Sequence, residues 1–206
     1  MLSKYSHVLL FTLLVYTFFS IIFVIQNQMM SILIYFLFGA LTFFLFLMIF
    51  GLFLPKNAHV ERSIIINVTP SEVFEEVVNY ENFVTWNPWS EKDPNMQHSF
   101  QGETGTIGSK YSWKGNKKVG SGYMQITDIV VNEHVEMDLN FGPRGNAKCG
   151  FVIQPNENGT RIIWYFDSPM GNFPLKRIVG AMMDKFIGTD YSIGLSNLQA
   201  KLEKQQ

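Results

Sequence analysis

The sequence HVERSIIINVTPSEVF, residues 59–74, decides the fold of the C-terminal part of the chain. Its first half is rich in β-branched residues and contains Ile64-Ile65-Ile66, which predicts a β-strand. Thr69 then suits the cap of a helix, Pro70 suits the first helical position, and Glu72 completes a capping box. The stretch therefore predicts a strand that is followed at once by a short helix.

Beyond this helix the pattern changes to strict alternation. The clearest example is residues 135–141, where Glu136, Asp138 and Asn140 separate large apolar residues. Similar runs, separated by turn sequences and by the hairpin signal Asn158-Gly159, predict about six antiparallel strands. Apolar residues at helical spacing over residues 173–202 predict a closing helix. We therefore expect an α+β fold in which a curved antiparallel sheet wraps around a long C-terminal helix.

Residues 2–54 differ sharply from the rest, because they carry one charged side chain, Lys4, and no acid. Two apolar runs, residues 8–25 and 29–54, are separated by the polar residues Gln26-Asn27-Gln28. A helix needs roughly 20 apolar residues to cross a bilayer, so each run suffices. We expect a two-helix transmembrane hairpin in residues 1–55 and one folded domain in residues 56–206. A cleaved signal peptide is the main alternative, although no small-x-small cleavage site follows the first run.

The charges beside the apolar runs predict the topology. Lys4 precedes the first run, Lys56 and Arg62 follow the second, and the expected turn between them carries no charge. The positive-inside rule then places both termini in the cytoplasm. We therefore expect an integral protein of the cytoplasmic membrane.

The composition of residues 56–206 limits the partners. This part holds 15 Lys and Arg against 17 Asp and Glu, a formal charge of −2, which does not favour nucleic-acid binding. Cys149 is the single cysteine, so an internal disulfide is excluded. The spacing of Cys149 and the four histidines matches no zinc template. We expect no metal and no cofactor, and the sequence leaves protein partners open.

The alternation places large aromatic and sulfur-containing side chains on the inner face of the predicted sheet, opposite the closing helix. Such side chains suit a flexible hydrophobic ligand as well as they suit a filled core. The expected lining consists of Met96, His98, Phe100, Tyr111, Trp113, Met124, Met137, Cys149, Phe151 and Trp164 from the strands, with Met182, Met183 and Phe186 from the helix.

His98 is the one titratable side chain that the alternation places among apolar neighbours. It is a candidate acid or base, with Tyr111 as a hydrogen-bond donor, but a histidine in a structural role is the more common outcome. The pattern places no carboxylate beside it, because Glu136 and Asp138 alternate to the opposite face. We therefore predict no catalytic constellation, and His98 and Tyr111 are only weak candidates.

The motif Trp86-Asn87-Pro88-Trp89 allows two roles. Trp86 and Trp89 form the mouth of a cavity near the membrane interface in one interpretation. In the other they lock the loop against the sheet. The turn that contains Lys114, Lys117 and Lys118 is either solvated or faces anionic lipid headgroups.

Five segments together resemble the START-like superfamily, and more narrowly its polyketide cyclase/dehydrase and lipid-transport branch. The resemblance covers essentially residues 59–204, and it depends on the order and spacing of the segments rather than on any one of them. It also extends to membrane-anchored members with a junction similar to Leu-Phe-Leu-Pro-Lys, residues 52–56. The five segments are residues 60–67, 70–74, 86–89, 120–122 and 187–191, the last with Gly194, Leu195 and Leu198.

The resemblance implies a helix-grip fold with a cavity between sheet and helix that takes hydrophobic ligands. We expect a membrane-anchored module that binds a lipid or another hydrophobic small molecule. A cyclase or dehydrase enzyme and a tethered regulatory or scaffolding domain with a vestigial cavity are the alternatives, because members of such superfamilies share a fold more than a reaction.

Overall fold

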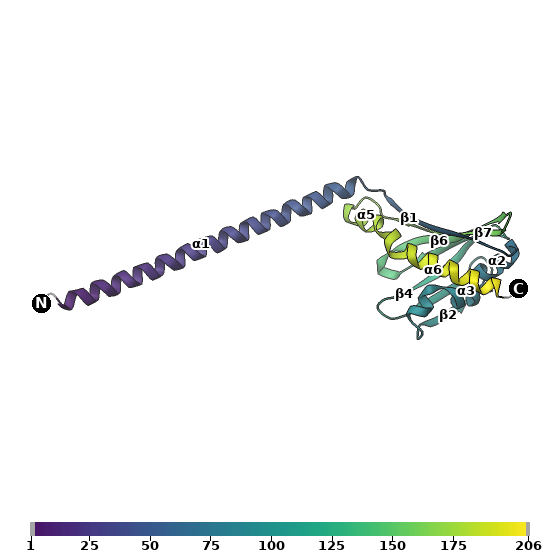
Figure 1. The fold of residues 1–206 in the computed structure, drawn as a ribbon, viewed down its shortest axis with the longest axis horizontal. Helices are drawn as coiled ribbons and strands as arrows, with labels where there is room; N and C mark the ends of the chain where they lie inside the picture. Colours follow the sequence, from purple (N-terminus) through teal and green to yellow (C-terminus); the bar gives the residue numbers. More distant parts are fainter. Residues whose placement is uncertain (1–2, 205–206) are drawn as a thin grey trace. The chain divides into compact units, whose positions relative to one another are not determined.

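The computed structural model describes residues 3–204, which fall into two compact units, Met1–Phe50 and Gly51–Gln206. The described residues of the first unit belong to helix α1 (Ser3–Leu52), which is one continuous helix of 50 residues (Figure 1). Gln26-Asn27-Gln28 lie inside it, so the structure does not show the predicted two-helix hairpin. The reason is that these three residues include neither Pro nor Gly, and nothing interrupts the backbone hydrogen bonds.

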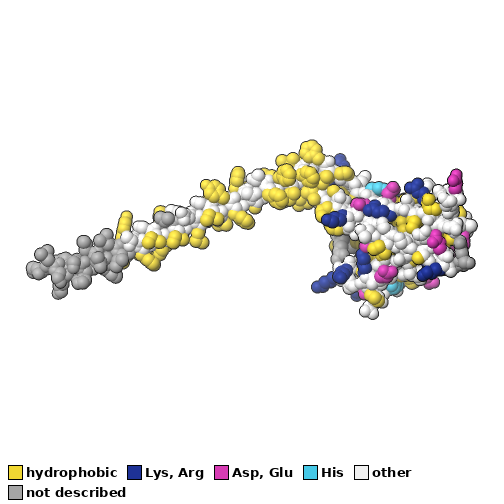
Figure 2. All heavy atoms as spheres, viewed as in Figure 1, with side chains coloured by type: hydrophobic (Ala, Val, Ile, Leu, Met, Phe, Trp, Pro, Cys, Tyr) yellow, Lys and Arg dark blue, Asp and Glu magenta, His cyan; other side chains and the backbone are white. Residues whose placement is uncertain are grey.

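Large apolar side chains are exposed along α1 where its side chains are described, and Figure 2 shows them on one face of the helix. Its part Val15–Leu52 has 38 residues and is, among the described residues, the one helix long and apolar enough to cross a membrane. A helix of 50 residues is about 75 Å long, more than the roughly 30 Å of hydrocarbon in a bilayer. A signal sequence near the amino terminus meets the same criteria of length and composition.

The second unit contains one seven-stranded antiparallel sheet in the order β1-β7-β6-β5-β4-β3-β2. The prediction of a curved antiparallel sheet with a long C-terminal helix, α6 (Met183–Glu203), is confirmed (Figure 1). The strands are β1 (Asn57–Ile66), β2 (Gln97–Gln101), β3 (Lys110–Lys114), β4 (Ser121–Val130), β5 (His134–Asn140), β6 (Asn146–Asn156) and β7 (Gly159–Pro169).

Short helices join these elements. They are α2 (Pro70–Val78), α3 (Tyr80–Trp86), α4 (Pro88–Lys92), the 3₁₀ turn η1 (Gly142–Arg144) and α5 (Pro174–Ala181). The predicted capping box starts α2: the Glu72 amide donates to the Thr69 hydroxyl at 3.4 Å, and the Thr69 amide donates to the Glu72 carboxylate at 2.8 Å. The Glu72 carboxylate stays ionised to lower pH than an ordinary Glu, because its hydrogen bonds with Thr69 lower the pKa of Glu72.

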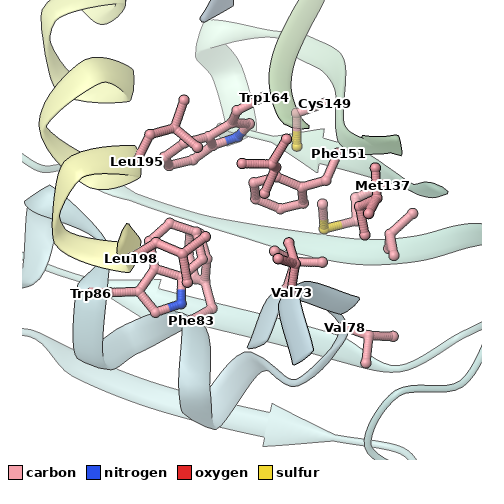
Figure 3. Packing of buried hydrophobic residues seen from close by; sticks show 14 of the residues in the cluster. Val73, Val78, Phe83, Trp86, Met137, Cys149, Phe151, Trp164, Leu195 and Leu198 are labelled. Atoms are coloured by element: carbon pink, nitrogen blue, oxygen red, sulfur yellow. The ribbon is translucent and has the colours of Figure 1, made fainter. Parts of the chain in front are cut away.

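The core of the domain lies between the sheet and the helices α2, α3 and α6 (Figure 3). Its centre is Trp164 of β7, whose ring stacks on Tyr191 of α6 with centroids 4.0 Å apart and an angle of 11°. Helix α6 approaches this closely because residue 194 is Gly: a Cβ there would lie 2.7 Å from the Trp164 ring. Phe83 and Trp86 of α3 pack edge-on against the same ring at 5.8 and 5.6 Å.

Candidate functional site

A cavity of about 140 Å³ lies between the inner face of the sheet and α6. The fifteen residues that line it in the described part of the chain include no Asp, Glu, Lys, Arg or His. Ten of the fifteen are buried and five are only partly buried, and we call these five the mouth. The buried lining is Phe83, Asn87, Met96, Tyr111, Met124, Leu139, Cys149, Trp164, Phe166 and Tyr191, and the mouth is Trp89, Trp113, Val119, Phe141 and Ile187.

The structure brings seven of the sequence-predicted residues together around this cavity. Six of them were predicted from the alternation and one, Trp89, from the tryptophan motif. They are Met96, Tyr111, Met124, Cys149 and Trp164 in the buried lining, and Trp89 and Trp113 at the mouth.

Five predicted residues from the sheet and the tryptophan motif lie elsewhere. Met137 and Phe151 are buried in the core, and Trp86 is 2 % exposed there rather than at a mouth. His98 and Phe100 share the inner face with their partners Trp113 and Tyr111, as alternation predicted. They do not line the cavity, because β2 is the edge strand and all five of its residues are exposed.

The predicted lining from the closing helix is displaced by one residue. Met182 and Phe186 are 44 % and 54 % exposed, whereas Met183 is partly buried and packs against the core. The inward stripe of α6 continues backwards from Tyr191 in steps of four, through Ile187 to Met183, so the residues before these face outward. Ile187 therefore lines the cavity where Phe186 was expected.

The sequence interpretation missed several lining residues. Leu139 and Phe166 alternate with Met137 and Trp164, so the same reasoning could have placed them. Phe141 ends the alternation of residues 135–141 just beyond β5, so it could have been placed too. Val119 lies outside the strands, where no periodicity indicates the direction of a side chain. Within the mouth, Trp89 and Trp113 were predicted, whereas no pattern indicated Val119.

Two polar side chains of the lining, Asn87 and Tyr111, are already hydrogen-bonded. Asn87 caps α4: its side-chain oxygen accepts from the amides of Trp89 and Ser90, both at 3.0 Å, and its Nδ2 donates to the Phe83 carbonyl at 3.2 Å. The Tyr111 hydroxyl lies 2.9 Å from Nδ1 of His98. A ligand in the cavity thus meets almost only apolar surface.

Burial keeps the ionisable groups of the lining neutral. It raises the pKa of Tyr111 and of Tyr191 well above their usual range. Burial, together with the negative charges of Asp138 and Glu136, also raises the pKa of Cys149 to about 12. Near neutral pH the thiol stays protonated, and its Sγ lies 3.9 Å from Met124 Sδ. The cavity therefore offers no nucleophile of the thiolate or carboxylate type.

Hydrogen bonds and an ion pair connect the segments around the mouth. The amide of Asn116, in the loop that carries Val119, donates to the buried Asp93 carboxylate at 2.6 Å. The Asn116 side chain in turn accepts from the amide of Val119 at 3.2 Å. Lys92 of α4 pairs with Asp190 of α6 at 2.5 Å. The mouth is thus bounded by three segments that are fixed to one another.

Comparisons with known proteins agree with this geometry. The family model for polyketide cyclase/dehydrase and lipid transport matches residues 57–203. No curated protein matches the sequence. The cluster of His, Cys, Asp or Glu that a metal site needs is also not found among residues 3–204.

Solved structures share the fold at low identity. A protein of unknown function from Staphylococcus aureus aligns with a TM-score of 0.57 and 14 % identity over 73 % of this chain and 98 % of its own. A protein from Rhodobacter sphaeroides has a TM-score of 0.55 and 12 % identity, with 72 % and 94 % covered. A protein from Mycobacterium smegmatis aligns with a TM-score of 0.52 and 11 % identity over 72 % of this chain and 93 % of its own. These neighbours show the helix-grip fold, and the family match over residues 57–203 shows that the chain belongs to the polyketide cyclase/dehydrase and lipid transport family.

Proposed function

We propose that the domain is a binding module that takes up the apolar part of a lipid or of another hydrophobic small molecule. The observation that carries this proposal is the cavity of about 140 Å³, whose lining has no charged residue and no free catalytic group. The family match supports it, because the family includes lipid transport. The ligand is held by burial of its apolar surface rather than by polar recognition.

The volume of the cavity limits what it holds. An engineered cavity of about 150 Å³ in another protein binds benzene, whereas drug-sized ligands occupy about 300–1,000 Å³. The cavity therefore suits one ring or a short segment of an acyl chain. A larger ligand would need movement of Met96, Met124 or the mouth, and the flexible Met side chains suit such adaptation.

Native mass spectrometry of the full chain, released gently from detergent micelles, tests this proposal. We expect one apolar molecule retained per folded chain, identified after solvent extraction. A folded chain that shows only its bare mass would argue instead for the scaffold with a vestigial cavity.

The cyclase or dehydrase alternative has one observation in its favour, the hydrogen bond between Tyr111 and His98. The comparison of the wild-type chain with Tyr111→Phe separates it from simple binding. A binding module retains the same molecule in both chains. An enzyme accumulates substrate in the variant and product in the wild type, which differ by the mass of one water for a dehydration.

We also propose that α1 anchors the domain in the cytoplasmic membrane, with the domain in the cytoplasm. The 38 residues Val15–Leu52 include no charged side chain, while Lys56 and Arg62 follow on the side of the domain. A single helix that crosses once would place the amino terminus opposite the domain. The expectation of both termini in the cytoplasm therefore loses its basis together with the hairpin.

Reporter fusions test this topology. In bacterial cells, a fluorescent protein fused after residue 206 should fluoresce, because it folds in the cytoplasm. An alkaline phosphatase fused at the same position should stay inactive. The reverse pattern would place the domain on the outer side.

A further inference from the structure

An apolar surface on α5 and the start of α6 takes no part in the cavity. Phe173, Val179, Met182 and Phe186 are between 44 % and 54 % exposed there. The helical path continues across the junction of the two helices, since the amide of Met182 donates to the Val179 carbonyl at 3.0 Å. Val179, Met182 and Phe186 are thus spaced by three and four residues along one side. We call these four residues, with Lys176 and Lys185, the α5 surface.

The charges within the α5 surface are positive. Lys176 and Lys185 are exposed, and each lies three residues from an apolar member of the surface. The nearby Asp184 is engaged elsewhere, because its carboxylate pairs with Arg62 at 2.8 Å. Large apolar side chains beside lysines are the pattern of helices that lie in the interfacial region of a membrane.

The α5 surface is fixed to the end of the apolar segment of the sequence. Gly51 packs so closely on Pro174, the first residue of α5, that a Cβ at position 51 would lie 2.5 Å from the Pro174 carbonyl oxygen. Arg177 of α5 is only 6 % exposed. Its Nη1 donates to the carbonyls of Leu52 at 3.0 Å and Leu54 at 3.5 Å.

A guanidinium at this place satisfies carbonyls that have no partner at the end of a helix and complements its negative end. Arg177 also donates to the Gly171 carbonyl at 2.9 Å, so it joins the end of the apolar segment to the loop before α5. The sequence interpretation considered only Lys56 and Arg62 near this end. Arg177 was missed because it follows Leu52 by 125 residues.

We propose that the α5 surface lies in the interfacial region of the membrane, with Lys176 and Lys185 directed to anionic lipid headgroups. This inference rests on the proposed anchor. If the apolar segment leaves the hydrocarbon near Leu52 and Leu54, α5 is held at the same depth by Arg177 and Pro174. Apolar side chains that are costly in water are then buried among lipids. Phe186 directly precedes Ile187 of the mouth in α6, so the α5 surface adjoins the mouth of the cavity along the chain.

Site-directed fluorescence in nanodiscs tests the surface. Phe186→Cys and Val179→Cys would be introduced singly into the full chain and labelled with the dye NBD. Val131→Cys and Ile107→Cys are matched controls, because these apolar residues are 65 % and 63 % exposed on the same domain. The native Cys149 is 2 % exposed, and the wild-type chain treated with the dye gives its background. The quencher is a phosphatidylcholine that carries a nitroxide near the headgroup.

We expect the dye at positions 186 and 179 to lose about half or more of its emission, and the dye at positions 131 and 107 to lose little. In nanodiscs with phosphatidylglycerol, the double substitution Lys176→Glu and Lys185→Glu should reduce the quenching at 186 to its value in pure phosphatidylcholine, because each lysine favours the anionic surface.

Each other outcome overturns the inference. Equal quenching at positions 186 and 131 in an anchored chain would contradict membrane contact by the α5 surface without contradicting the anchor. An unquenched dye at 186 that forms crosslinks between chains assigns the surface to a second copy. Extraction of the chain from vesicles by alkaline carbonate would contradict the proposed anchor, on which the membrane contact of the α5 surface rests.

Discussion

Replacement of Trp164 by Ala is expected to destabilise the domain by about 3–5 kcal/mol, which is typical for a large buried aromatic residue. Trp164 is 2 % exposed and contacts five aromatic rings of α3, α4, α6 and β6. Its loss leaves a void where the sheet, α3 and α6 meet. For a domain of this size the midpoint of thermal unfolding should fall by about 2–4 °C for each kcal/mol.

Differential scanning fluorimetry of the full chain in detergent measures this effect. Trp164→Phe keeps a ring against Tyr191 and should recover part of the lost stability. Phe100→Ala serves as a control on the exposed edge strand, where Phe100 is 41 % exposed, and should change the midpoint little. A Trp164→Ala chain that unfolds within a degree or two of the wild type would show that this ring does not organise the core.

Replacement of Val119 by Phe is expected to weaken ligand binding by about 5- to 150-fold while the domain stays folded. Val119 is a partly buried residue at the mouth, so its larger replacement enters the space of about 140 Å³ without disturbing the centre of the core. A well-packed ligand of ring size has no room to move aside, and overlap costs about 1–3 kcal/mol. Each 1.4 kcal/mol corresponds to a factor of ten in affinity.

The measurement uses 4-bromobenzyl alcohol, a neutral probe of one ring whose bromine quenches tryptophan emission. Trp89, Trp113 and Trp164 line the cavity, so the probe should quench them in the wild-type chain. Lys117→Phe adds the same ring to an exposed position of the same loop and should leave the titration unchanged. Equal quenching in the wild-type and Val119→Phe chains would mean that the probe acts from the detergent and not from the cavity.

Much of the fold could be predicted because local rules and tertiary packing agree over most of the domain. The Thr69 and Glu72 capping box needs only its own four residues, and the strand alternation placed Tyr111, Met124 and Cys149 on the inner face. The alternation did not predict burial correctly where burial depends on whether another strand or helix covers the residue. His98 and Phe100 have the expected face but lie on an edge strand, and no local rule shows which strand is at an edge.

The helices show a second limit of periodicity. The outward residues Met182 and Phe186 are four positions apart, as are the inward residues of α6, so the sequence alone does not distinguish an inner face from an outer one. The polar residues Gln26-Asn27-Gln28 failed as a turn signal for a different reason. Polarity by itself does not end a helix when every residue can keep its backbone hydrogen bonds.

The hydrogen bonds and the ion pair around the mouth have a kinetic consequence. In the proposed binding module, the mouth widens when the loop of Val119 separates from α4 or when α4 separates from α6. Either motion disturbs a bond to a carboxylate that is itself largely buried, Asp93 or Asp190. The lifetime of the complex is therefore expected to follow the frequency of these openings rather than the affinity of the apolar lining. Lys92 is 40 % exposed, so added salt should shorten that lifetime by weakening its pair with Asp190.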